Sequence, residues 1–171
     1  MKKILLALMT CFVLTSFHAV AQKTNVDWDH GITDFSHYKT YAWVKSARPA
    51  QSPFMDQRII AAIDAQLAAK GLRKVDSGAD LLVTYNAGVK EERSAITTGT
   101  GGWRWGGGMG RIDPVIENVG TLVVDLSDGE KKALIWRGTA TDTLSDKSDK
   151  NSKKIEKAVE KLFKKYPPSS K

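Results

Sequence analysis

The chain has 171 residues, a formal net charge of +7 and a single cysteine, Cys11. This length suffices for one domain with its own hydrophobic core, and one cysteine excludes an intrachain disulfide framework. The positive charge is moderate and the arginines are few and scattered, which argues against nucleic acid as a partner.

The first 21 residues have the pattern of a secretory signal peptide. Lys2 and Lys3 precede an apolar run over residues 4–17, and Ala19-Val20-Ala21 offers the small residues that a signal peptidase requires. The apolar run is too short to span a membrane. We therefore expect cleavage after Ala21, a periplasmic mature chain over residues 22–171, and no transmembrane span in that chain.

Cys11 raises the question of a lipid anchor, because exported proteins are often attached through a lipid on an early cysteine. Met9 and Thr10 stand where a lipidation signal has a small residue followed by Gly or Ala, and apolar sequence continues after Cys11. We expect plain secretion rather than lipid anchoring at Cys11. The mature chain then has no cysteine for a metal site.

The first half of the mature chain predicts two short strands and a helix. Residues 26–28 and 38–44 have the alternation of strands, with Tyr41 and Trp43 on one face. The helix has an apolar stripe of Met55, Ile59, Ile60, Ile63 and Leu67 at helical spacing.

Both ends of this helix are marked in the sequence. Ser52 is placed to accept hydrogen bonds from the free backbone N–H groups, and Pro53 suits the first helical position. Gly71 is placed to end the helix in a left-handed conformation, with Leu72 packing beyond it.

Three more strands are predicted over residues 80–90, 119–127 and 133–141. The last two are separated by a short turn that contains Gly129, which is typical of a hairpin. In the last strand, we expect Leu134, Trp136 and Ala140 to share the inner face.

A helix over residues 152–166 closes the chain before Pro167-Pro168. The resulting order, β-β-α-β-β-β-α, predicts a single α+β domain. We expect an antiparallel or mixed sheet of about five strands, with both helices packed on one face.

A loop rich in glycine and tryptophan, residues 97–113, joins the third and fourth predicted strands. It lacks the Lys-Ser or Lys-Thr pair of a P-loop and the spacing of a dinucleotide fingerprint, so we predict no cofactor. Its side chains suited to contact are Trp103, Arg104, Trp105 and Arg111. Two interpretations stay open: a contact loop for a membrane, glycan or protein partner, and a passive insertion whose tryptophans fold back on the sheet.

No residue pattern indicates a catalytic or metal site. His30 lies beside Asp27 and Asp29, but the mature chain offers neither a cysteine nor a third histidine to join them, and no serine lies in a nucleophile motif. We therefore expect a non-enzymatic binding module that acts through the loop, assisted by the lysine-rich C-terminal helix. The alternative is a hydrolytic or small-ligand-binding protein with a polar pocket on the sheet face near Asp125 and Arg137.

Several segments resemble the DUF4136 family of exported or lipid-anchored bacterial envelope proteins. They are residues 34–43 (DFSHYKTYAW), 70–72 (KGL), 79–85 (ADLLVTY), 120–126 (GTLVVDL), 134–140 (LIWRGTA) and 166–168 (YPP). The resemblance implies an envelope location and brings no activity, cofactor or catalytic residue. We expect Trp43 and Trp136 in the sheet core, and Arg137 facing away from Trp136.

Overall fold

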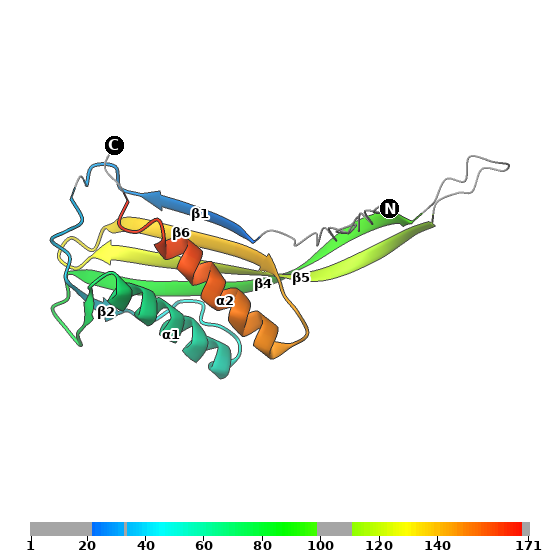
Figure 1. Cartoon of the computed structure of the whole chain (residues 1–171), viewed down its shortest axis with the longest axis horizontal. Coiled ribbons are helices and arrows are strands. Elements are labelled where there is room, and N and C mark those ends of the chain that lie inside the picture. The colour runs from blue at the N-terminus through cyan, green and yellow to red at the C-terminus, as the bar shows by residue number, and fades with distance from the viewer. Residues whose placement is uncertain (1–21, 33, 99–110, 169–171) are drawn as a thin grey trace, which may run out of the picture.

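The computed structural model describes residues 22–32, 34–98 and 111–168 (Figure 1). The predicted signal peptide lies outside these residues, so its cleavage stays a prediction. The elements in chain order are β1 (Lys23–Trp28), β2 (Thr40–Trp43), α1 (Pro53–Ala69), β3 (Arg73–Lys74), β4 (Leu81–Thr98), β5 (Arg111–Asp128), β6 (Leu134–Thr143) and α2 (Ser148–Phe163).

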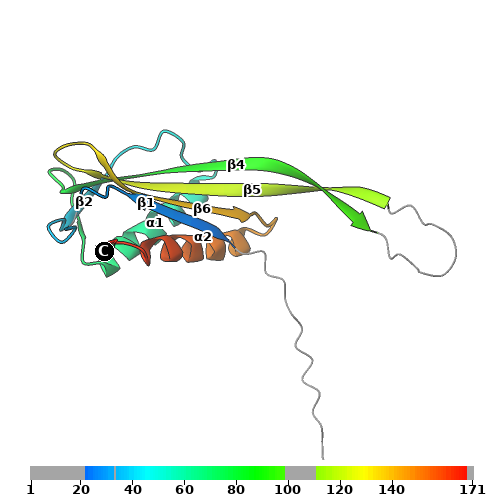
Figure 2. The same ribbon diagram turned by 90° about the horizontal axis from the view of Figure 1, so that it is seen from above.

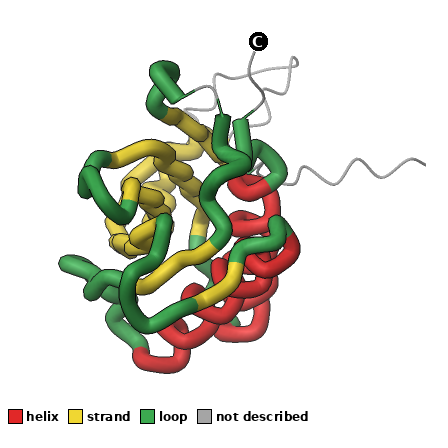
Figure 3. Tube along the Cα trace, turned by 90° about the vertical axis from the view of Figure 1, so that its left-hand side faces the viewer, coloured by secondary structure: helices red, strands yellow, loops and turns green. Residues whose placement is uncertain are grey.

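The described strands form one mixed sheet in the order β1-β6-β5-β4-β2-β3. The pairs β1–β6, β6–β5 and β5–β4 are antiparallel, whereas β2 runs parallel to both β4 and β3. Both helices cover the same face of the sheet (Figures 1 and 3). The predicted α+β class is confirmed, with β3 as an additional strand that is too short to show an alternating pattern.

The C-terminal end of α1 follows its prediction. Gly71 has a positive φ of 84°, its N–H donates to the Ala68 carbonyl at 2.9 Å, and the Leu72 N–H donates to the Leu67 carbonyl at 3.0 Å. These two bonds are those of a Schellman motif, and Leu72 is buried as the accompanying hydrophobic contact.

The start of α1 departs from its prediction in one respect. Pro53 is the first helical residue as expected, but the Ser52 side chain makes no capping hydrogen bond. Ser52 is exposed, so water can satisfy the first N–H groups of the helix in its place. The closing helix also differs, since α2 begins at Ser148 and ends at Phe163 rather than spanning residues 152–166. Its first turn is polar and carries no apolar stripe that would reveal it in the sequence.

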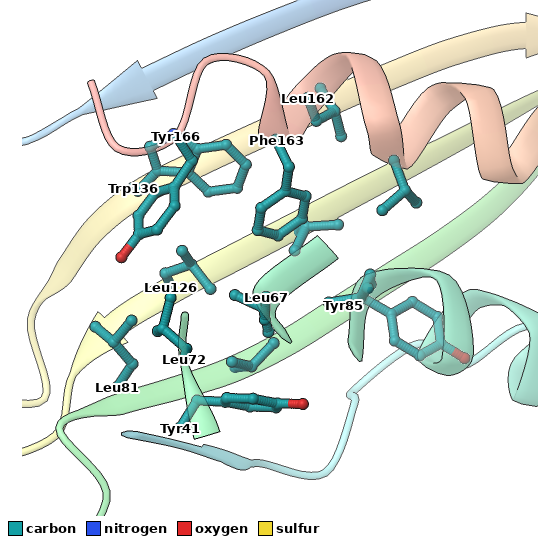
Figure 4. Packing of buried hydrophobic residues seen from close by; sticks show 14 of the residues in the cluster. Tyr41, Leu67, Leu72, Leu81, Tyr85, Leu126, Trp136, Leu162, Phe163 and Tyr166 are labelled. Carbon is teal, nitrogen blue, oxygen red and sulfur yellow. The ribbon is translucent and has the colours of Figure 1, made fainter. Parts of the chain in front are cut away.

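The core lies between the helices and the inner face of the sheet (Figure 4). Trp136, Phe163 and Tyr166 form an aromatic cluster at one end of this core, with ring centroids 5.2 to 6.0 Å apart. The aliphatic part of the core includes Ile59, Ile63, Leu67, Leu81, Val83, Leu122, Val124, Leu126, Val159 and Leu162. Trp136 is fully buried and Trp43 packs partly buried against the core, as predicted.

A β-bulge corrects the predicted inner face of β6. Leu126 pairs with Trp136 while Ser127 pairs with Leu134, so Ile135 is an extra residue on β6. The extra residue reverses the alternation at this end of the strand. Ile135 is therefore 2% exposed and Leu134 is 44% exposed, the reverse of the expectation for Leu134.

The β4–β5 hairpin is much longer than predicted. Its ladder runs without interruption from the pair Leu81–Asp128 to the pair Thr98–Arg111. The predicted loop over residues 97–113 was therefore too long, because strand pairing continues to Thr98 and resumes at Arg111. The strand β6 accompanies β5 only as far as the pair Val119–Thr143, and the hairpin then extends past the helices (Figures 1 and 2). We call residues 91–98 and 111–118 the arm.

Candidate functional site

The arm is a two-stranded ribbon that projects from the helix-covered domain (Figure 2). None of the arm residues whose side chains are described is buried, and Ile116 is 58% exposed. Across the ribbon, Ile116 pairs with Arg93, whose guanidinium lies 3.1 Å from a Glu91 carboxylate oxygen. Among the described residues, neither edge of the arm pairs with a further strand.

The predicted contact residues fall at the far end of the arm. Arg111 is the first residue of β5 and pairs with Thr98. Trp103, Arg104 and Trp105 lie outside the described residues. The two chain ends that flank the Gly/Trp-rich segment, residues 99–110, are thus held side by side at the end of the arm.

The second predicted pair, Asp125 and Arg137, lies on the sheet face opposite the helices and forms a two-pronged ion pair. Arg137 donates from Nε to Asp125 Oδ1 at 2.6 Å and from Nη2 to Oδ2 at 2.7 Å. The Asp125 side chain is 9% exposed and that of Arg137 is 49% exposed. The hydrogen bonds to Asp125 raise the pKa of Arg137 above its ordinary value. Arg137 faces away from Trp136, as expected. A ligand on this sheet face would compete with Asp125 for the Nε and Nη2 donors of Arg137.

The residues around His30 make local contacts. Asp27 accepts from the Trp28 N–H at 3.0 Å, Asp29 accepts from the Gly31 N–H at 2.8 Å, and the His30 ring packs on Trp28. Within residues 22–32, 34–98 and 111–168, no group of three or more His, Cys, Asp or Glu side chains is arranged to hold a metal. The described helices also include none that is long and apolar enough to cross a bilayer.

Three other aspartates fix the first half of the chain to the sheet and helices. Asp64 of α1 accepts from the Tyr41 hydroxyl and from Trp43 Nε1, both at 2.8 Å, and pairs with Lys74. Asp80 and Asp128 each accept backbone N–H groups, and these bonds lower the pKa of both carboxyls. Because each carboxylate is held by several donors, these residues are structural.

A cavity of about 260 Å³ lies where the arm leaves the domain, between the inner sheet face and both helices. Its sheet side is made by small residues, among them Ala87, Gly120 and Ala140. Its helix side includes Met55 and Ile59 of α1 together with Ile155 and Ala158 of α2. This cavity has no signal in the sequence, because its lining residues come from five elements and no single alanine or glycine marks it.

One side of the cavity is polar. Lys154 Nζ lies 3.0 Å from Asp142 Oδ1, and it also donates to the Thr143 carbonyl. Gln22 donates from Nε2 to Asp142 Oδ2 at 3.3 Å and to the Lys154 carbonyl at 3.0 Å. This cluster places a cation and an anion in contact, so it carries no net charge.

The sequence matches one family over almost all of its described length. Residues 24–168 match the model of the family "Domain of unknown function (DUF4136)". The chain belongs to the DUF4136 family. The comparison with curated proteins found no match for this DUF4136 chain.

Several solved structures share the fold of this DUF4136 protein. A PDZ domain protein from Parabacteroides distasonis aligns with a TM-score of 0.58 and 17% identity, over 88% of this chain and 36% of that one. This chain therefore spans about a third of the length of that protein. The PelC dodecamer from Paraburkholderia phytofirmans aligns with a TM-score of 0.50 and 17% identity, over 82% of this chain and 95% of that one.

Proposed function

We propose that this DUF4136 protein is a non-enzymatic periplasmic module that binds an envelope protein, a glycan or a membrane surface. The contact is made by the arm and the Gly/Trp-rich segment that the arm carries. The observation behind this proposal is the arm itself, in which β4 and β5 continue together for eight residue pairs past the last pair of β5 with β6.

The arm contributes little to the stability of the domain, which favours a role in binding. A two-stranded ribbon is at best marginally stable in water, because it has no second layer on which to bury its side chains. The described arm side chains are exposed or half-buried, so the arm adds little to the core. An extension of this kind is explained when it carries a contact surface away from the domain.

The composition of the arm and its segment indicates how the contact is made. Trp103 and Trp105 provide large apolar surfaces of the kind that lie in a partner's pocket or at a membrane interface. Arg104 and Arg111 provide donors for phosphate or carboxylate groups. The charges of Glu91, Glu92, Arg93 and Glu117 along the arm disfavour unspecific strand pairing at its edges.

Photo-crosslinking in intact cells tests this proposal. A photoreactive amino acid is placed at position 103, with a matched control at position 131 in the turn at the opposite end of β5. A discrete protein, lipid or glycan adduct from position 103, absent from position 131, supports the proposal. A second variant carries both Trp103→Ala and Trp105→Ala. We expect it to lose binding to the crosslinked species while its thermal stability stays unchanged. Equal adducts from both positions, or none, would contradict it.

Self-assembly is the second candidate, and the PelC structure favours it because that protein is a dodecamer. An exposed ribbon with two strand edges can pair with the ribbon of another copy. Native mass spectrometry distinguishes the candidates, since self-assembly gives a concentration-dependent oligomer of the purified chain. A monomer at all concentrations would exclude it.

A further inference from the structure

We propose that the cavity at the base of the arm binds a single acyl chain of a lipid whose head group is uncharged or zwitterionic. This site is separate from the contact surface of the arm, and it does not depend on the proposed function. Three features of the cavity carry the inference: its volume, its lining and the charge at its polar side.

The volume suits one slim apolar chain. At about 260 Å³, the cavity is larger than the apolar cavity of about 150 Å³ that stays dry and binds benzene in an engineered protein. It lies just below the range of about 300–1,000 Å³ that is usual for drug-sized ligands.

The lining changes from large to small residues where the cavity begins. On the inner face of β4, Val83 and Tyr85 are followed by Ala87. On β5, the inner positions run from Leu126 through Val124 and Leu122 to Gly120, which lies beside the Leu144 side chain. On β6, the Trp136 ring covers Gly138, and the cavity begins at Ala140. The helices do not fill the resulting space, so it stays open between Ile59 and Ile155.

Water is a poor occupant for most of this cavity. The cavity is open to solvent on one side, and its floor and roof offer mainly methyl and methylene groups, so water inside it finds few polar partners. Val89 lines the cavity and is 53% exposed, which continues the apolar surface outward along the inner side of β4. An apolar occupant would cover this surface and displace water from it.

The polar side of the cavity determines the head group. Lys154 and Asp142 lie together at the cavity wall, and both side chains keep contact with solvent. A hydroxyl or a zwitterionic group can donate to Asp142 and accept from Lys154. A free carboxylate would gain from Lys154 but meet the negative charge of Asp142. The ligand is therefore a lipid chain with an uncharged or zwitterionic head rather than a free fatty acid.

Methyl NMR tests this assignment directly. The protein is labelled at the isoleucine and methionine methyl groups and titrated with a twelve-carbon lysophosphatidylethanolamine below its critical micelle concentration. We expect the resonances of Met55, Ile59 and Ile155 to shift in a saturable manner. Ile63 and Ile135, which lie in the core but outside the cavity lining, serve as internal controls and should stay unchanged.

A cavity-filling variant provides the matched test. Ala158→Leu places three extra carbon atoms in the cavity and should weaken the affinity at least tenfold, while Ala65→Leu on the exposed side of α1 should leave it unchanged. If Ala158→Leu fails to fold, Ala87→Leu fills the same space from the sheet side. Absence of saturable shifts at the lining methyl groups would overturn the proposal, as would unchanged affinity in the filled variant. Dodecanoate binding as tightly as the lysolipid would overturn the head-group assignment.

Discussion

The Trp136 ring occupies the space above Gly138 of the same strand, so that position 138 has no room for a side chain. A Cβ atom added to Gly138 would lie 2.6 Å from Trp136 Cη2 and 3.1 Å from Leu162 Cδ1. Because Trp136 is also packed against Phe163 and Tyr166, its ring cannot move aside without disturbing the aromatic cluster. The glycine in the segment Trp136-Arg137-Gly138 is therefore a packing requirement of the core.

The first prediction concerns this contact. Gly138→Ala should lower the free energy of unfolding by about 1–3 kcal/mol, the usual cost of overpacking a filled core. Urea unfolding measures the change. Gly88→Ala is the matched control, because a Cβ at Gly88 would have no described atom within 4 Å outside its chain neighbours. Equal unfolding midpoints for the two variants would contradict the prediction.

The second prediction concerns the ion pair on the opposite sheet face. Arg137→Met removes the partner of the buried Asp125 carboxylate. Loss of one member of a fully buried pair costs about 3–5 kcal/mol, and the half-exposed position of Arg137 reduces the expected cost to about 2 kcal/mol. Adding Asp125→Leu should restore much of this stability, since no unpaired charge then remains. A double variant as unstable as the single one would show that the pair is not the cause.

The core of the fold could be predicted from the sequence because burial imposes a pattern. The apolar stripe of α1 predicts a helix with one buried face. Gly71 and Leu72 predict where that helix ends, because a glycine can adopt the left-handed conformation of a helix terminator. The arm could not be predicted, because its described side chains are exposed or half-buried on both faces and no alternation of apolar and polar residues results. The bulge at Ile135 was hidden for a related reason, since Leu134 and Ile135 are equally apolar and only the register with Leu126 and Ser127 decides which is buried.

The candidate sites could also be predicted only in part, because they depend on the register between strands. The sequence identified Asp125 and Arg137 as residues of one polar face, but only the paired register of β5 and β6 places them in contact. The cavity had no signal in the sequence. It exists because small residues on three adjacent strands face the same gap between the helices, and that coincidence requires the registers of all three strands.

The third prediction is a loss of stability at acid pH that involves Asp80. The backbone N–H of Lys39, the Thr40 hydroxyl and the Thr40 N–H all donate to Asp80 Oδ2 at 2.9 Å, and these bonds lower the pKa of Asp80 in the folded state. The contribution of Asp80 is complete above its unfolded pKa of about 3.9 and is lost as the pH falls through the lower folded value.

Urea unfolding over a series of pH values measures this effect. The stability of the wild type should change little from pH 7 to about pH 5 through this group, and should fall below about pH 4. Asp80→Asn should be less stable at pH 7 and lose less stability on acidification, so that the two curves converge at low pH. Parallel curves would show that Asp80 does not contribute to the acid transition.

The fourth prediction separates the arm from the fold. Replacing residues 92–117 by an Asn-Gly turn joins Glu91 to Asn118, which face each other in the β4–β5 ladder, and keeps the hydrogen bond from the Leu144 N–H to the Asn118 carbonyl. No described side chain in the deleted part is buried, so the free energy of unfolding should change by less than about 1 kcal/mol. Binding of the variant to the partner identified by crosslinking, or its self-assembly, should be abolished.

A partial deletion provides the control for this variant. Replacing residues 95–114 by the same Asn-Gly turn keeps the pair Ser94–Val115 and about half of the arm, and it removes the same Gly/Trp-rich segment. If the segment alone makes the contact, both deletions abolish binding; if the strand edges of the arm take part, the partial deletion keeps some of it. A loss of several kcal/mol in the full deletion would instead mean that the arm stabilises the domain, and its projection past the helices would then have a structural cause.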